Sequence, residues 1–140
     1  MTKEEKDLVL KDLSARVPYG VYVFGKWKKE APNGTDGAIF TLDSKYLDDM
    51  YNTDCIDVPF DEFMPYLIPL SCMTPDDEIA MAECANNVTA PSTWSFFEHH
   101  IYSESLKIDW LNEHFYDYRG LIEKGLAFKA PDDMYKNKNA

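Results

Sequence analysis

Two short segments rich in β-branched and aromatic residues restrict the fold of this chain more than any other feature of its sequence. The first runs from Tyr19 to Trp27 and the second from Gly37 to Leu42. Pro32-Asn33-Gly34, between them, is a turn signal. Segments of this composition favour pleated, partly buried strands. The sequence therefore predicts two antiparallel strands joined by a long loop.

The N-terminal segment has the signals of a helix. Thr2 and Glu5 have the spacing of a capping box, in which each side chain bonds the backbone of the other residue. Apolar residues follow at helical spacing. We expect a helix from about residue 3 to 15 that ends before Pro18, because a proline disfavours helical geometry in the residue before it.

Two further helices are predicted in the second half of the chain. Thr74 and Pro75 precede three acidic residues, which is a strong helix start, and this helix is expected to reach about Asn86. A later helix is predicted to begin at Ser105 and to end near Gly120, a residue suited to positive φ.

The segment between residues 43 and 73 is predicted to be short and irregular. Three prolines exclude a long helix there. They are Pro59, Pro65 and Pro69. Residues 56–58 are expected to form a short edge strand, and residues 63–70 an irregular segment or one helical turn.

A third strand is predicted at residues 94–102, where aromatic residues gather. Apolar residues at 121–128 are expected to anchor the end of the domain, and the chain turns polar from Ala130. Together these elements predict one α+β domain over residues 1–130, with a small antiparallel sheet packed by about three helices. Residues 131–140 are predicted to be a flexible tail.

The acidic residues are unevenly distributed. The net charge is −11, and residues 43–106 contain 13 acidic residues and a single lysine. Such a field repels phosphate backbones and attracts basic partners, although acidic loops can also serve solubility alone. We expect a protein partner of basic character and no direct contact with nucleic acid. The predicted contact residues in this region are Asp48, Asp49, Asp54, Asp57, Asp61 and Glu62.

Residues 112–120, NEHFYDYRG, combine acids, aromatics, a histidine and an arginine. A carboxylate two residues before an arginine often ties a corner together by charge-assisted hydrogen bonds. The same residue types form interface hot spots. Both interpretations stay open, and the candidate recognition residues are Tyr116, Tyr118 and Arg119.

Reactive chemistry has little support in the sequence. A metal site drawing on His99, His100 or His114 lacks any known ligand spacing. A nucleophile drawn from Cys72 or Cys84 lacks a catalytic motif. No cofactor is therefore expected, and the three cysteines, which include Cys55, are predicted to be free and mostly buried. The chain also lacks an apolar run long enough to span a membrane or direct secretion, so a cytoplasmic location is predicted.

Three stretches resemble a family of small uncharacterised proteins from Bacteroides-type gut bacteria, their phages and mobile elements. They are LVLKDLSARVPYGV at 8–21, LIPLSCMTPDDE at 67–78 and IDWLNEHFYDYRGLIEKGLAFKAPDDMY at 108–135. The resemblance covers about 50 of the 140 residues and implies a host setting and a fold-defining frame, but it supplies no catalytic residues. Phe115 departs from the family, where a second histidine is expected beside His114.

These observations favour a non-enzymatic accessory or regulatory protein of a phage or mobile element, which acts by binding another protein. Two alternatives remain. One is an enzyme with a pocket of histidine, cysteine and carboxylate side chains. The other is a structural virion or assembly component, which would associate with itself through apolar patches.

Overall fold

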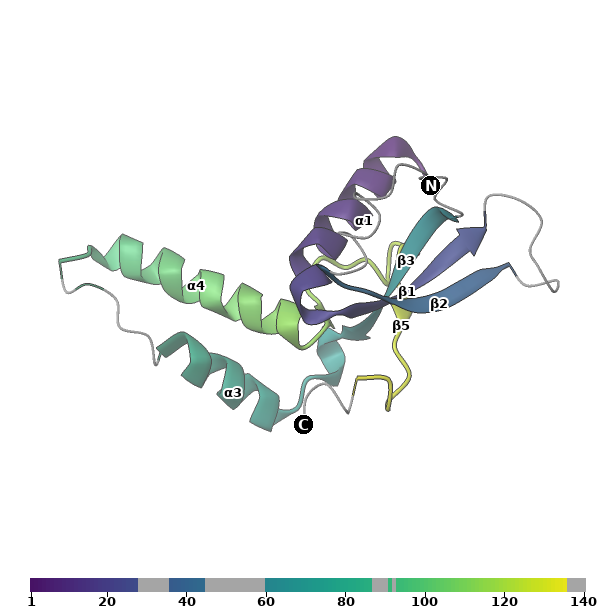
Figure 1. The fold of residues 1–140 in the computed structure, drawn as a ribbon. Coiled ribbons are helices and arrows are strands. Elements are labelled where there is room, and N and C mark those ends of the chain that lie inside the picture. The colour runs from purple at the N-terminus through teal and green to yellow at the C-terminus, as the bar shows by residue number, and fades with distance from the viewer. Residues whose placement is uncertain (28–35, 45–59, 87–90, 92, 136–140) are drawn as a thin grey trace.

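The computed structural model describes residues 1–27, 36–44, 60–86, 91 and 93–135, and its sheet is built around the central strand β3 (Figure 1). Within these residues three α-helices pack with a five-stranded sheet of order β2-β1-β3-β4, in which β5 also pairs with β3. The predicted α+β class is therefore confirmed. The sheet is mixed rather than purely antiparallel, because β4 and β5 run parallel to β3.

The predicted N-terminal helix and hairpin are confirmed. Helix α1, Lys3–Arg16, begins with the expected capping box, and a short 3-10 turn containing Pro18 follows it. Strands β1, Val21–Trp27, and β2, Gly37–Leu42, pair antiparallel. A side chain at Gly37 would place a Cβ only 2.0 Å from the carbonyl oxygen of Gly25, so this position requires glycine. The predicted loop and edge strand at 56–58 lie outside the described residues.

The predicted irregular segment at 63–70 is wrong, because Phe60–Pro69 forms the long strand β3. Its ladder with β1 includes the pair Val23 and Pro65. Beyond Pro65, β3 pairs parallel with β5, Phe128–Lys129, and then with β4, Tyr116–Asp117. A proline cannot donate a ladder hydrogen bond, and Pro65 stands where the strand changes partners, so the strand accommodates it.

Tyr135 holds the sheet together at this change of partners. Its hydroxyl accepts a hydrogen bond from the amide of Tyr22 on β1 (3.0 Å) and donates one to the carbonyl of Tyr66 on β3 (2.7 Å). Burial raises the pKa of this hydroxyl, which keeps it protonated as a donor. Its ring is 2% exposed and stacks on Phe115 at 3.9 Å between centroids. Residues 131–135 therefore belong to the domain, and the predicted tail boundary at 131 is wrong.

The helix predicted after the middle segment is confirmed as α3, Pro75–Asn86. Thr74 caps it, since its hydroxyl accepts from the amide of Asp77 (3.2 Å) and the Asp77 carboxylate accepts from the amide of Thr74 (3.3 Å). These two hydrogen bonds satisfy two backbone amides at the start of the helix, which have no carbonyl partner within it.

The predicted strand at 94–102 and the predicted helix start at Ser105 are both wrong, because one helix, α4, spans Phe96–Glu113. Ser95 caps it by accepting from the amide of Glu98 (3.2 Å), and its hydroxyl donates to the Glu98 carboxylate (3.2 Å). The aromatic residues favour a strand locally. A helical cap and a packing partner in α3 outweigh that preference.

Helix α4 also ends earlier than predicted. It stops at Glu113, and Phe115 takes a positive φ of 65°. This conformation is strained for a bulky residue, but the Phe115 ring is 1% exposed in the core and its carbonyl accepts from the amide of Ile68 (2.8 Å). Gly120 has the expected positive φ of 70°, in a turn after β4 rather than at a helix end.

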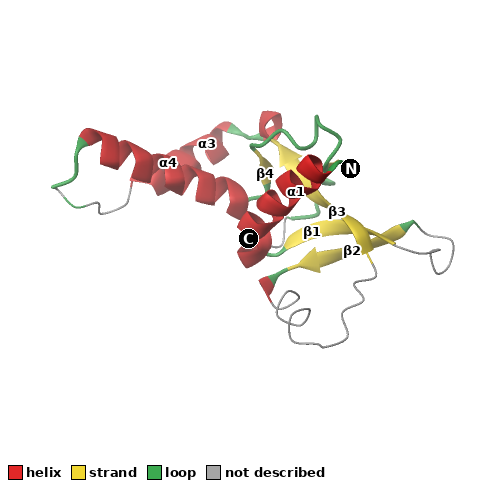
Figure 2. Cartoon of the chain, turned by 90° about the horizontal axis from the view of Figure 1, so that it is seen from above, coloured by secondary structure: helices red, strands yellow, loops and turns green. Residues whose placement is uncertain are grey.

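The main core lies between α1 and the sheet (Figure 2). Apolar residues of α1, the first three strands and the C-terminal segment meet there. They include Val9, Leu13, Val21, Val23, Leu67, Leu121 and Leu126. None of the helices among the described residues has the length and apolar character that a membrane crossing requires.

Candidate interaction surface

Helices α3 and α4 lie against each other and project away from the rest of the chain (Figure 1). We call α3 and α4 the arm, and α1, the sheet and residues 114–135 the body. At the base of the arm, Met73 and Met81 pack against a cluster formed by Trp110, Leu111 and Tyr116. Helix α3 therefore covers one face of α4, and the base of both helices is fixed to the body.

A buried ion pair on α1 fixes α4 to the body. Arg16 is 0% exposed and donates to both oxygens of the Asp12 carboxylate, at 2.9 and 3.1 Å. It also donates to the backbone carbonyls of Leu111 (3.5 Å) and Tyr116 (2.7 Å), at the end of α4 and in β4. A buried charge needs this number of partners. The pair therefore determines where the arm leaves the body.

The predicted corner residues Tyr118 and Arg119 extend this network. Arg119 donates to Asp12 (3.2 Å) and to the Tyr118 hydroxyl (3.0 Å), which donates to the Asn112 side chain at the end of α4 (2.9 Å). Both guanidinium groups lie over the Tyr118 ring, Arg16 at 5.4 Å and Arg119 at 4.9 Å from its centroid. Tyr118 and Arg119 are half-buried and already engaged with the body and the arm.

Tyr116 and Asp117 also have internal partners. Tyr116 is 6% exposed, which leaves it little surface for a partner, and its hydroxyl donates to Asp77 on α3 (2.8 Å). Burial, together with this carboxylate, raises the pKa of Tyr116. The Asp117 carboxylate accepts from the amides of Leu121 (2.9 Å) and Ile122 (3.0 Å). Segment 112–120 thus forms a structural corner in this fold.

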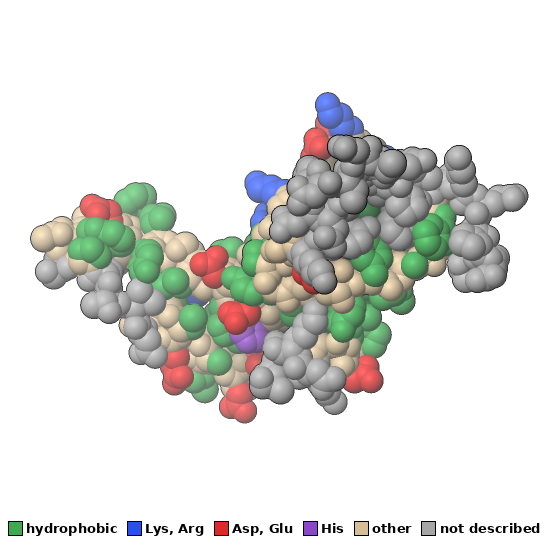
Figure 3. Space-filling model, in the orientation of Figure 1, with side chains coloured by type: hydrophobic (Ala, Val, Ile, Leu, Met, Phe, Trp, Pro, Cys, Tyr) green, Lys and Arg blue, Asp and Glu red, His purple; other side chains and the backbone are tan. Residues whose placement is uncertain are grey.

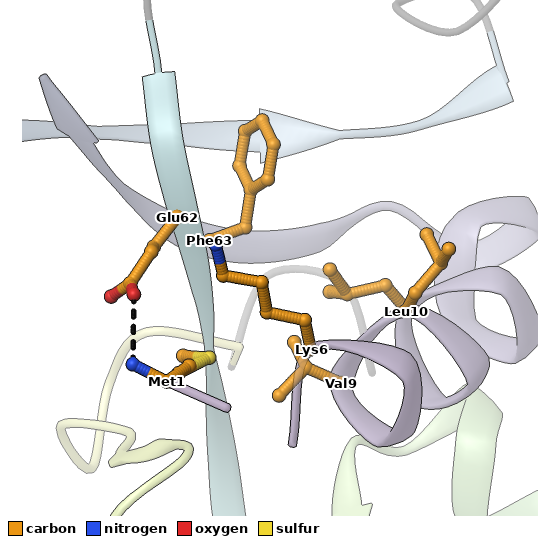
Figure 4. Close-up of a pocket in the computed structure, with 7 residues that line it drawn as sticks. Met1, Lys6, Val9, Leu10, Glu62 and Phe63 are labelled. Carbon is orange, nitrogen blue, oxygen red and sulfur yellow. Dashed lines mark hydrogen bonds and ion pairs between the residues drawn. The ribbon is translucent and has the colours of Figure 1, made fainter. Parts of the chain in front are cut away.

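The acidic residues predicted as a contact face lie mostly outside the described part of the chain. These are Asp48, Asp49, Asp54 and Asp57, together with the side chain of Asp61. Glu62 is described, and its carboxylate accepts from the N-terminal amine of Met1 at 3.1 Å. The two groups border a small pocket of about 180 Å³ between α1 and β3 (Figure 4). The Glu62 carboxylate is thus paired within the chain.

The histidines and cysteines do not gather into a reactive cluster in the described ranges. His99 lies on α4, against the ring of Trp94 at 6.0 Å, and His114 stacks on Trp110 at 3.9 Å. Among the described residues, no three His, Cys, Asp or Glu side chains are placed to hold a metal ion. Cys72 and Cys84 are exposed, which corrects the expectation of mostly buried thiols. Cys55 lies outside the described residues.

A hollow of about 340 Å³ includes the exposed Cys72 at the junction of the arm and the sheet. Tyr116, Lys129, Asp132 and Tyr135 share its wall. Both tyrosine hydroxyls are already bonded within the fold, to Asp77 and to the Tyr66 carbonyl. Both tyrosine hydroxyls at the hollow therefore serve the fold, and the Cys72 thiol in its wall is exposed.

The face of α4 away from α3 is apolar and exposed. Phe97 is 70%, Ile101 52% and Ile108 39% exposed. Their spacing of four and seven residues places them on one side of the helix, opposite half-buried Leu106 and buried Trp110. We call Phe97, Ile101 and Ile108 the outer face. In Figure 3 hydrophobic side chains cover much of the outer half of the arm.

A groove borders the outer face near the beginning of α4. Its volume is about 320 Å³, and it is lined by Trp94, Phe97, Glu98, Ile101, Tyr102 and Ser105. The Trp94 and Tyr102 rings meet edge to face at 5.5 Å and form one wall. The volume is at the lower end of the range for ligand pockets, roughly 300–1,000 Å³. An apolar groove of this kind suits side chains presented by another protein.

This surface was not predicted from the sequence, although the sequence contains a signal for it. Ser95-Phe96-Phe97-Glu98 has the capping-box pattern that starts a helix. With the helix begun at Phe96, the spacing of Phe97, Ile101 and Ile108 predicts a second apolar stripe.

The chain has no match among protein-family models, curated proteins or solved structures.

Proposed function

We propose that this chain is a non-enzymatic accessory or regulatory protein that binds another protein through the outer face of α4. The resemblance of three stretches to small proteins of Bacteroides-type bacteria, phages and mobile elements supports such a setting, inside the cell. The proposal rests on one observation above all, the exposure of Phe97 and Ile101 on the side of α4 that α3 leaves open.

Exposed apolar side chains on α4 would gain free energy if a partner buried them. Fully burying a phenylalanine or isoleucine side chain stabilises a structure by about 1.5–3 kcal/mol relative to leaving it exposed. Single exposed apolar residues are common on any protein and need no explanation. Phe97, Ile101 and Ile108 instead share one helix face and adjoin a groove, which is the arrangement of a docking site.

This proposal gives a smaller part to the acidic segment 43–62 and to the corner residues Tyr118 and Arg119. The corner residues are held within the network of Asp12 and Arg16. The acidic segment provides a field that steers a basic partner toward the chain, which affects association rate more than final affinity.

The decisive experiment compares tagged wild-type chain with the double variant Phe97→Ser/Ile101→Ser in co-purification from the cells in which the chain is native. We expect a specific protein to be recovered with the wild type and its yield to fall at least about tenfold with the variant. Leu10→Ser is the matched control, because Leu10 is 63% exposed on α1, far from the outer face in the fold. Circular dichroism would check that all three proteins are folded.

The outcomes separate the proposal from its alternatives. Recovery of the same partner by the double variant would contradict a docking role for the outer face. A structural virion or assembly component predicts instead that the wild type forms oligomers that the double variant abolishes, as measured by analytical ultracentrifugation. An enzyme predicts an activity that survives loss of the outer face and falls when Cys72 is replaced.

A further inference from the structure

The charge of the arm indicates what kind of partner its outer face accepts. From Pro75 to Glu113 the chain contains eight carboxylates and a single lysine, Lys107. That lysine is paired with Glu104 at 3.2 Å. The arm is therefore strongly acidic and has no basic side chain left over among its described residues. An acidic surface of this kind disfavours a partner of the same charge.

Three of these carboxylates lie beside the outer face. Helical geometry places Glu104 on one side of the stripe of Phe97, Ile101 and Ile108, and Glu98 and Asp109 on the other. Glu98 and Asp109 are both exposed, and Glu98 also lines the apolar groove. Lys107 offsets Glu104, so the side of Glu98 and Asp109 is the acidic border of the stripe. An apolar stripe with an acidic border is complementary to an apolar stripe with a basic one.

A second copy of the chain fits this surface poorly. Two arms packed outer face to outer face would bring their acidic borders together with only Lys107 to offset them on each side. Like charges that face each other across an interface oppose association, and they do so most at low salt. The same borders attract lysine and arginine side chains.

We infer that the outer face of α4 binds a basic amphipathic helix, whose apolar residues enter the groove beside Trp94 and whose lysine or arginine residues pair with Glu98 and Asp109. This inference rests on the proposed protein-binding function and specifies the chemistry of the partner. The apolar contacts hold the helix in place, and the charges determine its identity and its rate of association.

The test uses three labelled synthetic peptides and fluorescence anisotropy with the full chain. The first peptide is helical, with leucines at helical spacing flanked by lysines. The second has glutamates in place of the lysines, and the third has the composition of the first in scrambled order. We expect the first peptide to bind at least about tenfold more tightly than either of the others, and its affinity to fall as salt rises.

Two sets of variants locate the binding. Phe97→Ser/Ile101→Ser and the charge-neutralising pair Glu98→Gln/Asp109→Asn should each weaken binding of the first peptide about tenfold. Glutamine at position 98 preserves the capping pattern of α4. Glu83→Gln is the matched control, since Glu83 is exposed on α3, and it should leave the affinity unchanged. Shifts of backbone amide resonances in α4 would confirm the location.

Four results would overturn the inference. They are equal binding of the acidic peptide, equal binding of the scrambled peptide, binding of none of the three, and dimerisation of the chain through Phe97 and Ile101. If a native partner depends on the outer face but the acidic peptide binds as well as the basic one, the protein-binding function stands and the basic character of the partner is wrong. If no native partner depends on the outer face, the proposed function itself fails.

Discussion

The body of the molecule buries charged side chains at its centre, whereas the arm exposes large apolar side chains to solvent. Arg16 and Asp12 are both 0% exposed in the body, while Phe96 and Phe97 on the arm are 88% and 70% exposed. Each departs from the usual distribution of residues. The buried charges are explained within the chain, because Arg16 and Asp12 pair with each other and Arg16 also donates to backbone carbonyls at the end of α4 and in β4. Within the described part of the chain the Phe96 ring stacks on exposed His100 at 6.5 Å between centroids, and both phenylalanine rings stay open to solvent.

The body and the arm therefore differ in what their unusual residues do. The body provides a rigid base, in which an ion pair, Tyr118 and the cluster of Trp110 hold α4 at its C-terminal end. The arm presents a surface at the other end of the same helix. A surface on a rigid element loses little conformational entropy on binding, which favours affinity. Changes in the body should therefore alter stability, and changes on the outer face should alter binding.

The largest effect is expected from Asp12→Ala. This change removes the carboxylate that pairs both Arg16 and Arg119, so it leaves one fully buried and one half-buried guanidinium without their acidic partner. Breaking a buried ion pair from one side costs about 3–5 kcal/mol of unfolding free energy. Urea denaturation would measure it, with Asp7→Ala at an exposed position of α1 as the control. A loss as small as that of the control would show that the network does not hold the body together.

A matched pair of truncations compares the two regions directly. Leu67→Ala, at a 0% exposed position of β3, should lower the free energy of unfolding by about 2–5 kcal/mol. Ile101→Ala, at a 52% exposed position of α4, should change it by no more than about 0.5 kcal/mol. Both values come from the same denaturation experiment. Similar losses for the two variants would mean that the outer face of α4 is packed in solution.

A smaller effect is expected from Tyr135→Phe. This change keeps the ring that stacks on Phe115 and removes the hydroxyl that joins the amide of Tyr22 to the carbonyl of Tyr66. Loss of one partner from buried hydrogen bonds costs about 1–3 kcal/mol. Tyr19→Phe, at a position that is 38% exposed, is the control for removing a tyrosine hydroxyl. Equal stability of Tyr135→Phe and wild type would place the C-terminal segment outside the cooperative domain.

The smallest effect is expected in the pH dependence of stability, through the hydrogen bond between Asp77 on α3 and Tyr116 on β4. Burial would raise the pKa of Asp77, but hydrogen bonds from Tyr116 and Thr74 outweigh it, so the pKa is lowered from 3.8. The stabilisation from Asp77 is therefore complete above 3.8 and is lost as the pH falls through the lowered pKa. The stability difference between wild type and Asp77→Asn should be constant at higher pH and should shrink only in strong acid. A difference that does not change with pH would contradict this, and Asp76→Asn is the control.

The sequence alone determined the elements whose signals are local. Thr2 with Glu5 and Thr74 with Pro75 define the starts of α1 and α3, because a cap acts within a few residues of itself. The hairpin of β1 and β2 follows equally from two neighbouring segments of strand-forming residues. For the corner at 112–120 the sequence left two interpretations open, and it gave no sign of Asp12 on α1, to which Arg119 donates.

The remaining elements depend on contacts between segments that lie far apart along the chain, so local sequence signals do not predict them. Strand β3 exists in spite of its prolines since β1, β4 and β5 supply its hydrogen bonds from both earlier and later segments. Tyr135 belongs to the core because its hydroxyl accepts from the amide of Tyr22 and donates to the carbonyl of Tyr66. The exposure of the outer face also depends on tertiary contacts. Two sides of α4 are apolar, and the position of α3 determines which one is covered and which remains exposed.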